Sequence, residues 1–332
     1  MLSYILKRCA AAIPLLAVLS FISFTLIQLP PGDYGDQIKN YAITLSGMSE
    51  ADAEILAQDY RVRHGLDKPF HTQYLNWMKG ILTEGDFGFS FNSNKPISEL
   101  VADRLPMTLF IALLCHLGAT LFGAALGIVA ARKQYTWIDN LTTLFAFIGM
   151  TTPRFVLSLI MLYWLVFIVG SSHVAALFSP EFALAPWSFA KFVNLMQHIW
   201  PVLLVAIYGG MAQNLRVMRS NVLDVMQAQY VETAKAKGLS SRRVLFKHIV
   251  PNALHPLIMY QGVALPYMIA GELEVAIVFS LPTVGPLIVE SMAIQDIYVV
   301  STFMMLLAAT LVIGNLLADL LLAALDPRIR LA

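Results

Sequence analysis

Charged residues are scarce in this sequence: they make up 13% of its 332 residues, whereas a soluble domain carries about 25%. The net charge is only +1, which excludes the broad basic face expected of a nucleic-acid-binding protein. Cysteine is nearly absent as well. Cys9 and Cys115 both lie in apolar runs, so they predict neither a disulfide framework nor a metal site, and we interpret them as small packing residues.

Apolar residues, in contrast, reach 58% and are gathered into long runs. A membrane-spanning helix needs about 20 mostly apolar residues, because the hydrocarbon layer is roughly 30 Å thick. This pattern predicts an all-α membrane protein with six transmembrane helices. The predicted spans are Cys9–Leu29, Thr108–Ala131, Leu141–Gly170, Ile199–Val217, Pro256–Ser280 and Val299–Leu325.

The first span has one alternative interpretation, a cleaved signal peptide that begins with Lys7 and Arg8. Its apolar run is longer than a typical signal core, and residues 29–33 offer no small-residue cleavage site. We therefore favour a permanent anchor.

Lysine and arginine set the predicted orientation, because cytoplasmic loops of membrane proteins carry an excess of them. With the N-terminus inside, the cytoplasmic segments hold 13 of the 22 basic residues, whereas the short external stretches 171–198 and 281–298 hold only Lys191. Both termini are then cytoplasmic. The chain divides into the N-terminus and first span at 1–29, an extracytoplasmic insertion with a few short helices at 30–107, and a five-helix core at 108–332.

The cytoplasmic loop 216–255 has the most informative pattern. Good helix formers run from Tyr230 to Lys237, and Gly238 supplies the left-handed residue with which helices commonly end. Ser240 or Ser241 is suited to cap a second helix before the chain returns to the membrane at Pro251. A short helix held across the cytoplasmic surface in this way is suited to contact a soluble partner.

This loop resembles the EAA loop of ABC importer permeases. Glu232, Thr233 and Ala234 stand at its first three positions, Gly238 follows at the family's spacing, and Val250-Pro251 closes it. Thr233 replaces the family's second alanine, and His248 stands where the family has isoleucine. Neither change removes the pattern of helix, break and helix.

The resemblance extends along almost the whole chain and is closest to the dipeptide/oligopeptide permease group. Segments similar to that group occur in the same order: Tyr4–Arg8, Pro31–Asp33, Gly65–Pro69, Gly85–Gly88, Phe279–Gly285 and Asp326–Arg330. The resemblance implies the type I importer fold and a non-catalytic permease subunit in the bacterial cytoplasmic (inner) membrane. The coupling-loop residues that it implies are Tyr230, Glu232, Thr233, Ala234, Lys237, Gly238 and Pro251.

The same resemblance implies partners: a second permease, two ABC ATPase subunits that use ATP and magnesium, an external solute-binding protein and membrane lipid. The expected solutes are di- and oligopeptides, with oligosaccharides or opine-like compounds as the alternative. The chain has no phosphate-binding loop of the type Gly-x-x-x-x-Gly-Lys-Ser/Thr, so ATP hydrolysis is expected in the partners, and we expect no cofactor on this chain. The permease pair is open between homodimer and heterodimer.

Arg154, Glu272 and Glu274 are charged residues inside predicted spans, where charge is costly and marks a partner or a watery path. Treated as straight helices, the two spans place all three at similar depth. We expect Arg154 to pair with Glu272 or Glu274, or to line the translocation path. The permease group commonly has a small or polar residue at the position of Arg154.

Two other classes of protein compete with this interpretation. An ion-coupled secondary transporter would show charged relays across several spans, often with an inverted repeat, and neither is visible. A membrane-embedded enzyme would need a cluster such as His-Glu-x-x-His, whereas the seven histidines are scattered.

Overall fold

The computed structural model describes the backbone of residues 2–171 and 176–325. Side chains are described in the same ranges, except at residues 2–5, 262–263, 265–270, 318 and 321–325. The described chain is helical apart from one antiparallel pair of two-residue strands. It divides into two compact units, one formed by residues 1–5, 107–285 and 310–332 and the other by residues 6–106 and 286–309.

The first unit contains most of the long helices. Its elements are the greater part of α5 (Ile97–Arg132), α6 (Trp137–Thr151), α7 (Arg154–Tyr163) with the π-helical turn η1 (Trp164–Ile168), α8 (Pro180–Ala183), α9 (Phe189–Met226), α10 (Gln229–Ala236), α11 (Ser241–Val244), η2 (Leu245–Ile249), α12 (Val250–Val278) and the end of α14 (Ile297–Leu325). Helix α9 packs against α6 and α12, and α7 packs against both α9 and α12. The unit is therefore built around α9.

Two glycines bring α5 close to α9. A Cβ on Gly123 would lie 2.8 Å from the carbonyl oxygen of Met211, and one on Gly127 would lie 2.7 Å from that of Leu215. Small residues four apart are the usual way for membrane helices to approach one another closely. The absence of a side chain at these two positions thus sets the distance between the helices.

Within the described residues, four helices are long and apolar enough to cross a membrane: Leu6–Gln28, Ile97–Arg132, Phe189–Met226 and Ile297–Leu317. They confirm the predicted first, second, fourth and sixth spans. The predicted fifth span, Pro256–Ser280, lies in α12 up to Val278. Several side chains of α12 fall outside the described residues, so the total of six spans stays a prediction.

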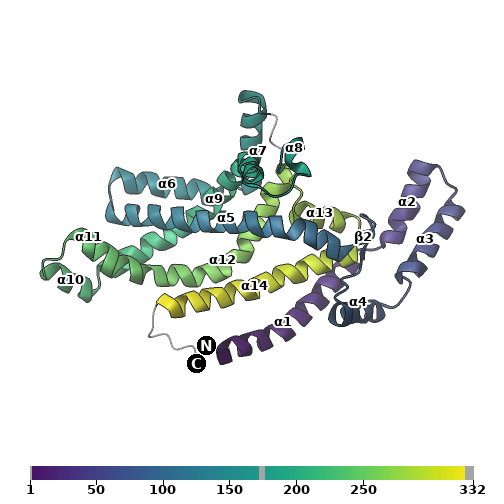
Figure 1. The fold of residues 1–332 in the computed structure, drawn as a ribbon, viewed down its shortest axis with the longest axis horizontal. Coiled ribbons are helices and arrows are strands. Elements are labelled where there is room, and N and C mark those ends of the chain that lie inside the picture. The colour runs from purple at the N-terminus through teal and green to yellow at the C-terminus, as the bar shows by residue number, and fades with distance from the viewer. Residues whose placement is uncertain (1, 172–175, 326–332) are drawn as a thin grey trace. The chain divides into compact units, whose positions relative to one another are not determined.

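The predicted third span, Leu141–Gly170, is not one straight helix. Helices α6 and α7 meet at 99°, a bend visible in Figure 1. Pro153 lacks the N–H that would continue the ladder of α6, and Thr152 before it is extended, with φ −86° and ψ 122°. A depth counted along one straight helix therefore does not apply to Arg154.

The second unit contains most of α1 (Leu2–Gln28), three short helices, the strand pair and the start of α14. The short helices α2 (Tyr34–Ser46), α3 (Glu50–His64) and α4 (Phe70–Glu84) confirm the prediction of short helices in the insertion. The remaining elements are β1 (Phe89–Ser90), β2 (Lys95–Pro96), the first turns of α5 and most of α13 (Val284–Ala293).

An aromatic core holds this second unit together. Phe24 of α1 stacks on Trp77 of α4 with ring centroids 5.4 Å apart, and Leu66, Phe91 and Ile297 complete the buried cluster. Burial of aromatic side chains of this size supplies much of the stability of a small unit. The insertion is thereby fixed to α1 and to the start of α14.

Candidate functional site

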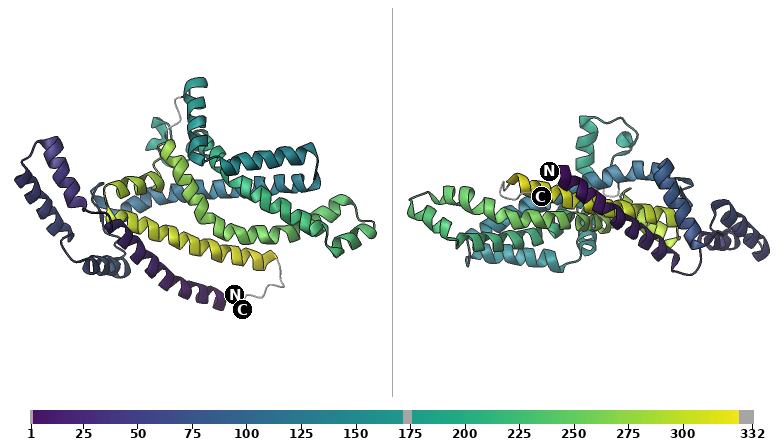
Figure 2. Two further views of the ribbon diagram at one scale, coloured as in Figure 1. Left: turned by 180° about the vertical axis from the view of Figure 1, so that it is seen from behind. Right: turned by 90° about the horizontal axis from the view of Figure 1, so that it is seen from below.

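The loop 216–255 has the predicted local structure. Helix α9 ends at Met226, α10 follows, and Gly238 has φ +75° after it. The side chain of Ser240 accepts a hydrogen bond from Arg243 N and so caps α11. Both views of Figure 2 show α10 and α11 at the tip of the first unit, beyond the ends of α9 and α12. This confirms the predicted helix, break and second helix.

One face of α10 is anchored in the unit. Val231 is fully buried and Ala234 nearly so, within a cluster that includes Met218 and Val222 of α9. Residues of α5, α11, η2 and α12 complete this cluster. Because well-packed interiors transmit displacement rather than absorb it, a force on α10 is passed to α9 and α12.

The opposite face of α10 is open. Tyr230 is 46% exposed, and Glu232, Thr233 and Lys237 are exposed as well. Glu232 and Lys235 form an ion pair of 2.6 Å on this face. Among the predicted coupling residues of this segment, Ala234 is buried and attaches the helix to the unit. Tyr230, Glu232, Thr233 and Lys237 are exposed and therefore available to a partner.

Pro251, the last predicted residue of the loop, lies in the first turn of α12. The backbone is already helical before it, because α11 and η2 run into α12 without a gap. A role of Pro251 in coupling stays a prediction.

Arg154 begins α7, and its guanidinium lies among glycines of neighbouring helices. It occupies the space that a Cβ on Gly271 of α12 would take, and its Nε lies 2.8 Å from the position of a Cβ on Gly209 of α9. Arg154 thus reaches the level of Glu272, the residue after Gly271.

The two acids of α12 have different surroundings. Glu272 is 1% exposed, and neither of its carboxyl oxygens has a hydrogen-bond partner among the described residues. Glu274 is exposed and lines a cavity of about 430 Å³ that Arg154 also lines. In the part of the chain that the structure describes, no nitrogen–oxygen contact within 4.0 Å joins Arg154 to either acid. A role of the three residues in the path stays a prediction.

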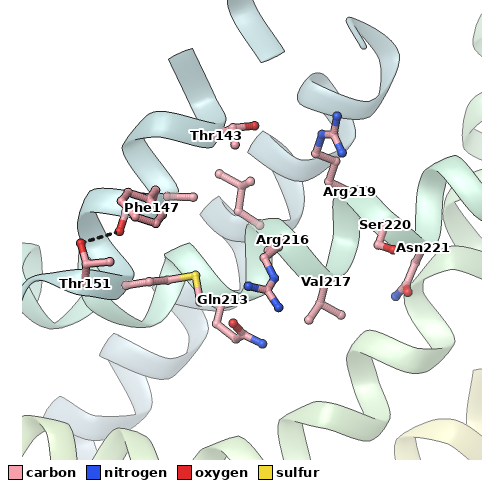
Figure 3. Close-up of a pocket in the computed structure, with 12 residues that line it drawn as sticks. Thr143, Phe147, Thr151, Gln213, Arg216, Val217, Arg219, Ser220 and Asn221 are labelled. Carbon is pink, nitrogen blue, oxygen red and sulfur yellow. Dashed lines mark hydrogen bonds between the residues drawn. The ribbon is translucent and has the colours of Figure 1, made fainter. Parts of the chain in front are cut away.

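A larger groove of about 820 Å³ lies between α6 and α9. Figure 3 shows Thr143, Phe147 and Thr151 on α6, and Arg216 and Arg219 on α9. In the sequence these two arginines indicate only the cytoplasmic side of the membrane, and the groove was not predicted.

One wall of the groove is fixed by an ion pair that sequence reasoning also missed. Arg219 donates two hydrogen bonds to Asp139, of 2.7 and 2.8 Å, and Asp139 is 3% exposed. The sequence does contain a signal for this pair. Asp139 directly precedes the predicted third span, and Arg219 directly follows the predicted fourth, so both are expected near the same face of the membrane.

A chain of polar side chains links three helices of the first unit. Thr120 of α5 donates to Gln261 of α12 over 2.7 Å, and Gln261 donates to Asn214 of α9 over 3.1 Å. Asn214 in turn donates to the carbonyl of Gly210 over 3.3 Å. Such bonds between membrane helices fix their register.

Comparison with known proteins identifies the family. Residues 123–331 match the family described as binding-protein-dependent transport system inner membrane component, and residues 1–112 match the N-terminal region of such membrane components. The chain belongs to this family. It is therefore an all-helical, multi-pass inner membrane protein, and the predicted resemblance to the oligopeptide permease group is confirmed.

Among its relatives is the oligopeptide transport system permease protein AppB of Bacillus subtilis (strain 168), 35% identical over 99% of both chains. The glutathione transport system permease protein GsiC of Salmonella typhimurium (strain LT2) is 32% identical over 99% of both chains. A solved structure titled as inward-facing conformations of the MetNI methionine ABC transporter matches with a TM-score of 0.54. It shares 16% identity and covers 69% of this chain and 97% of its own, so it shows the fold of this permease family.

Proposed function

We propose that this chain is the permease subunit of an ATP-driven importer of di- and oligopeptides, and that α10 couples it to an ATPase. The observation that carries this proposal is the two-sided character of α10, with Val231 and Ala234 packed into the unit and Tyr230 and Glu232 exposed. A helix of this kind can receive motion on one face and pass it on through the other.

Peptides are the solute class that the relatives favour. One relative is named for oligopeptide transport and another for glutathione, itself a short peptide. An importer of oligosaccharides built on the same plan is the alternative, and neither of these two relatives favours it.

The proposed assembly contains a second permease, two ATPases and an external solute-binding protein. The sequence has no phosphate-binding loop, which supports a non-catalytic role for this chain. The excess of lysine and arginine supports cytoplasmic termini and a cytoplasmic loop 216–255. The insertion 30–107 then lies outside and the core 108–332 carries the path.

The test is co-purification of the tagged chain from bacterial membranes, combined with ATPase and peptide-uptake assays. Tyr230→Ala and Glu232→Ala should release the ATPases and abolish peptide uptake while the chain stays in the membrane. Trp137→Ala is the matched control, because Trp137 is also exposed but lies outside α10.

Gly238 allows a sharper comparison. Gly238→Pro should uncouple the complex, because proline cannot adopt a φ of +75°, whereas Gly238→Asn should retain coupling, because asparagine tolerates this conformation. A chain that purifies alone, with uptake indifferent to all of these changes, would refute the proposal.

A further inference from the structure

An open cavity of mixed charge lies at the bend between α6 and α7, and we call it the elbow cavity. It has a volume of about 430 Å³ and is lined by residues 152–155 of the bend, Gly209 of α9 and Glu274 of α12, among others. An arginine and a glutamate therefore face one space inside apolar helices. Ionisable residues in such positions are costly, and they usually face a partner or a water-filled path.

Close packing against glycines, rather than an ion pair with an acid, fixes the position of the Arg154 side chain. Its guanidinium lies over Gly209 and Gly271, and either glycine would collide with it if it carried a Cβ. No acid among the described residues lies within 4.0 Å of the Arg154 guanidinium. The planar guanidinium is thus left with donors suited to a carboxylate.

The start of α7 adds to the same preference. Pro153 provides no side-chain cap for this helix, whose N-terminus carries partial positive charge. In membrane transporters, N-terminal ends of broken helices commonly face anionic groups of the solute. Arg154 and the helix end therefore favour the same ligand charge.

Glu274 of α12 lines the same cavity and favours the opposite charge. Met150 and Phe155 add apolar surface to the lining and are 43% and 49% exposed. A small solute that carries both a carboxylate and an ammonium group beside an apolar body would match this combination.

We infer that the elbow cavity binds zwitterionic solutes, with the solute carboxylate on Arg154 and the ammonium group on Glu274. This inference rests on the proposed function and extends it, because a short peptide with free termini is a solute of this class. Selection for free termini would then occur in the permease itself.

The direct test measures binding to the full chain in lipid nanodiscs, without other subunits. In a background of Cys9→Ser and Cys115→Ala, Met150→Cys is labelled with a charged, water-soluble maleimide. We expect a dipeptide with free termini to slow this labelling severalfold, and the same dipeptide with acetylated and amidated termini to leave it unchanged. Labelling of Tyr135→Cys, an exposed residue away from the cavity, should be insensitive to both peptides.

Arg154→Gln added to the same background should raise the peptide concentration needed for protection by roughly 10- to 100-fold, the loss expected of one charge-assisted contact. Arg154→Lys keeps the positive charge and should raise the peptide concentration needed for protection by a smaller factor. Gly271→Ala should resemble Arg154→Gln, because its Cβ displaces the guanidinium without changing any charge.

Several outcomes would overturn the site: no reaction of Met150→Cys, equal protection by free and blocked peptides, or protection that survives Arg154→Gln and Gly271→Ala. Uptake by the assembled transporter separates this failure from failure of the proposed function. Peptide uptake without selective protection refutes only the site, whereas the absence of any peptide uptake refutes the proposed function.

Discussion

Asp139 and Arg219, 80 positions apart in the sequence, form a two-bond ion pair that joins the start of α6 to α9. The bonds measure 2.7 and 2.8 Å, and Asp139 also accepts a hydrogen bond from Tyr135 N. The side chains of Asp139 and Arg219 are 5% and 27% exposed. Because one partner is nearly buried, the loss of the other leaves a charge with little access to water.

We expect Asp139→Ala and Arg219→Ala each to lower the free energy of unfolding by about 1–3 kcal/mol, less than for a fully buried pair because Arg219 reaches solvent. Thermal unfolding of the purified chain in detergent measures this, and the double variant should be clearly less destabilised than the sum. The exposed pair Glu232–Lys235 is the matched control, with an expected effect of about 0–1 kcal/mol. Equal losses of unfolding free energy for the two pairs would contradict the stabilising role of the Asp139–Arg219 pair.

The polar chain through Gln261 should contribute to the register of three helices. Gln261→Leu removes bonds to Thr120 and Asn214 at similar volume, and we expect a loss of about 0.5–2 kcal/mol in unfolding free energy. Thr120→Val removes only one of these bonds and should cost less. A Gln261→Leu variant as stable as the unmodified chain would show that the chain of bonds is not stabilising.

The close approach of α5 to α9 should be sensitive to one methyl group. Gly127→Ala places a Cβ 2.7 Å from the carbonyl oxygen of Leu215, so the helices must separate, at a cost of about 1–3 kcal/mol. Ala125→Leu, on the exposed side of the same helix, adds a larger group and should be tolerated. Thermal unfolding of both variants checks this, and the reverse order of stability would rule out the predicted packing.

The insertion should loosen in mild acid because of His64. Its ring lies against Tyr60, with centroids 4.2 Å apart, and burial together with the charge of Arg63 lowers the pKa of His64 below its ordinary value of about 6.5. The folded state therefore favours the neutral ring. The stabilisation is complete above pH of about 6.5 and is lost as the pH falls towards the lowered pKa.

Hydrogen exchange of α3 and α4 at pH 7.5 and 5.5 measures this effect. Protection should fall at the lower pH in the unmodified chain and fall less in His64→Gln, which does not titrate. Identical pH dependence in the two proteins would assign the change to other groups.

Several parts of this protein follow from local sequence. Runs of about 20 apolar residues must lie in a membrane, and an excess of lysine and arginine marks their cytoplasmic ends. The pattern around Gly238 and Ser240 predicts helix, break and helix because both residues act on backbone groups within a few positions of themselves. For that reason the local structure of the loop 216–255 can be predicted from the amino-acid sequence alone.

The surroundings of Arg154 were decided by tertiary structure. Pro153 predicts that a helix stops, but the 99° direction of α7 depends on how it packs against α9 and α12. That direction brings Arg154 over Gly209 and Gly271, and no rule of spacing relates three positions so far apart. The pairs Asp139–Arg219 and Gln261–Asn214 are of the same kind, since contacts between distant segments depend on the fold as a whole.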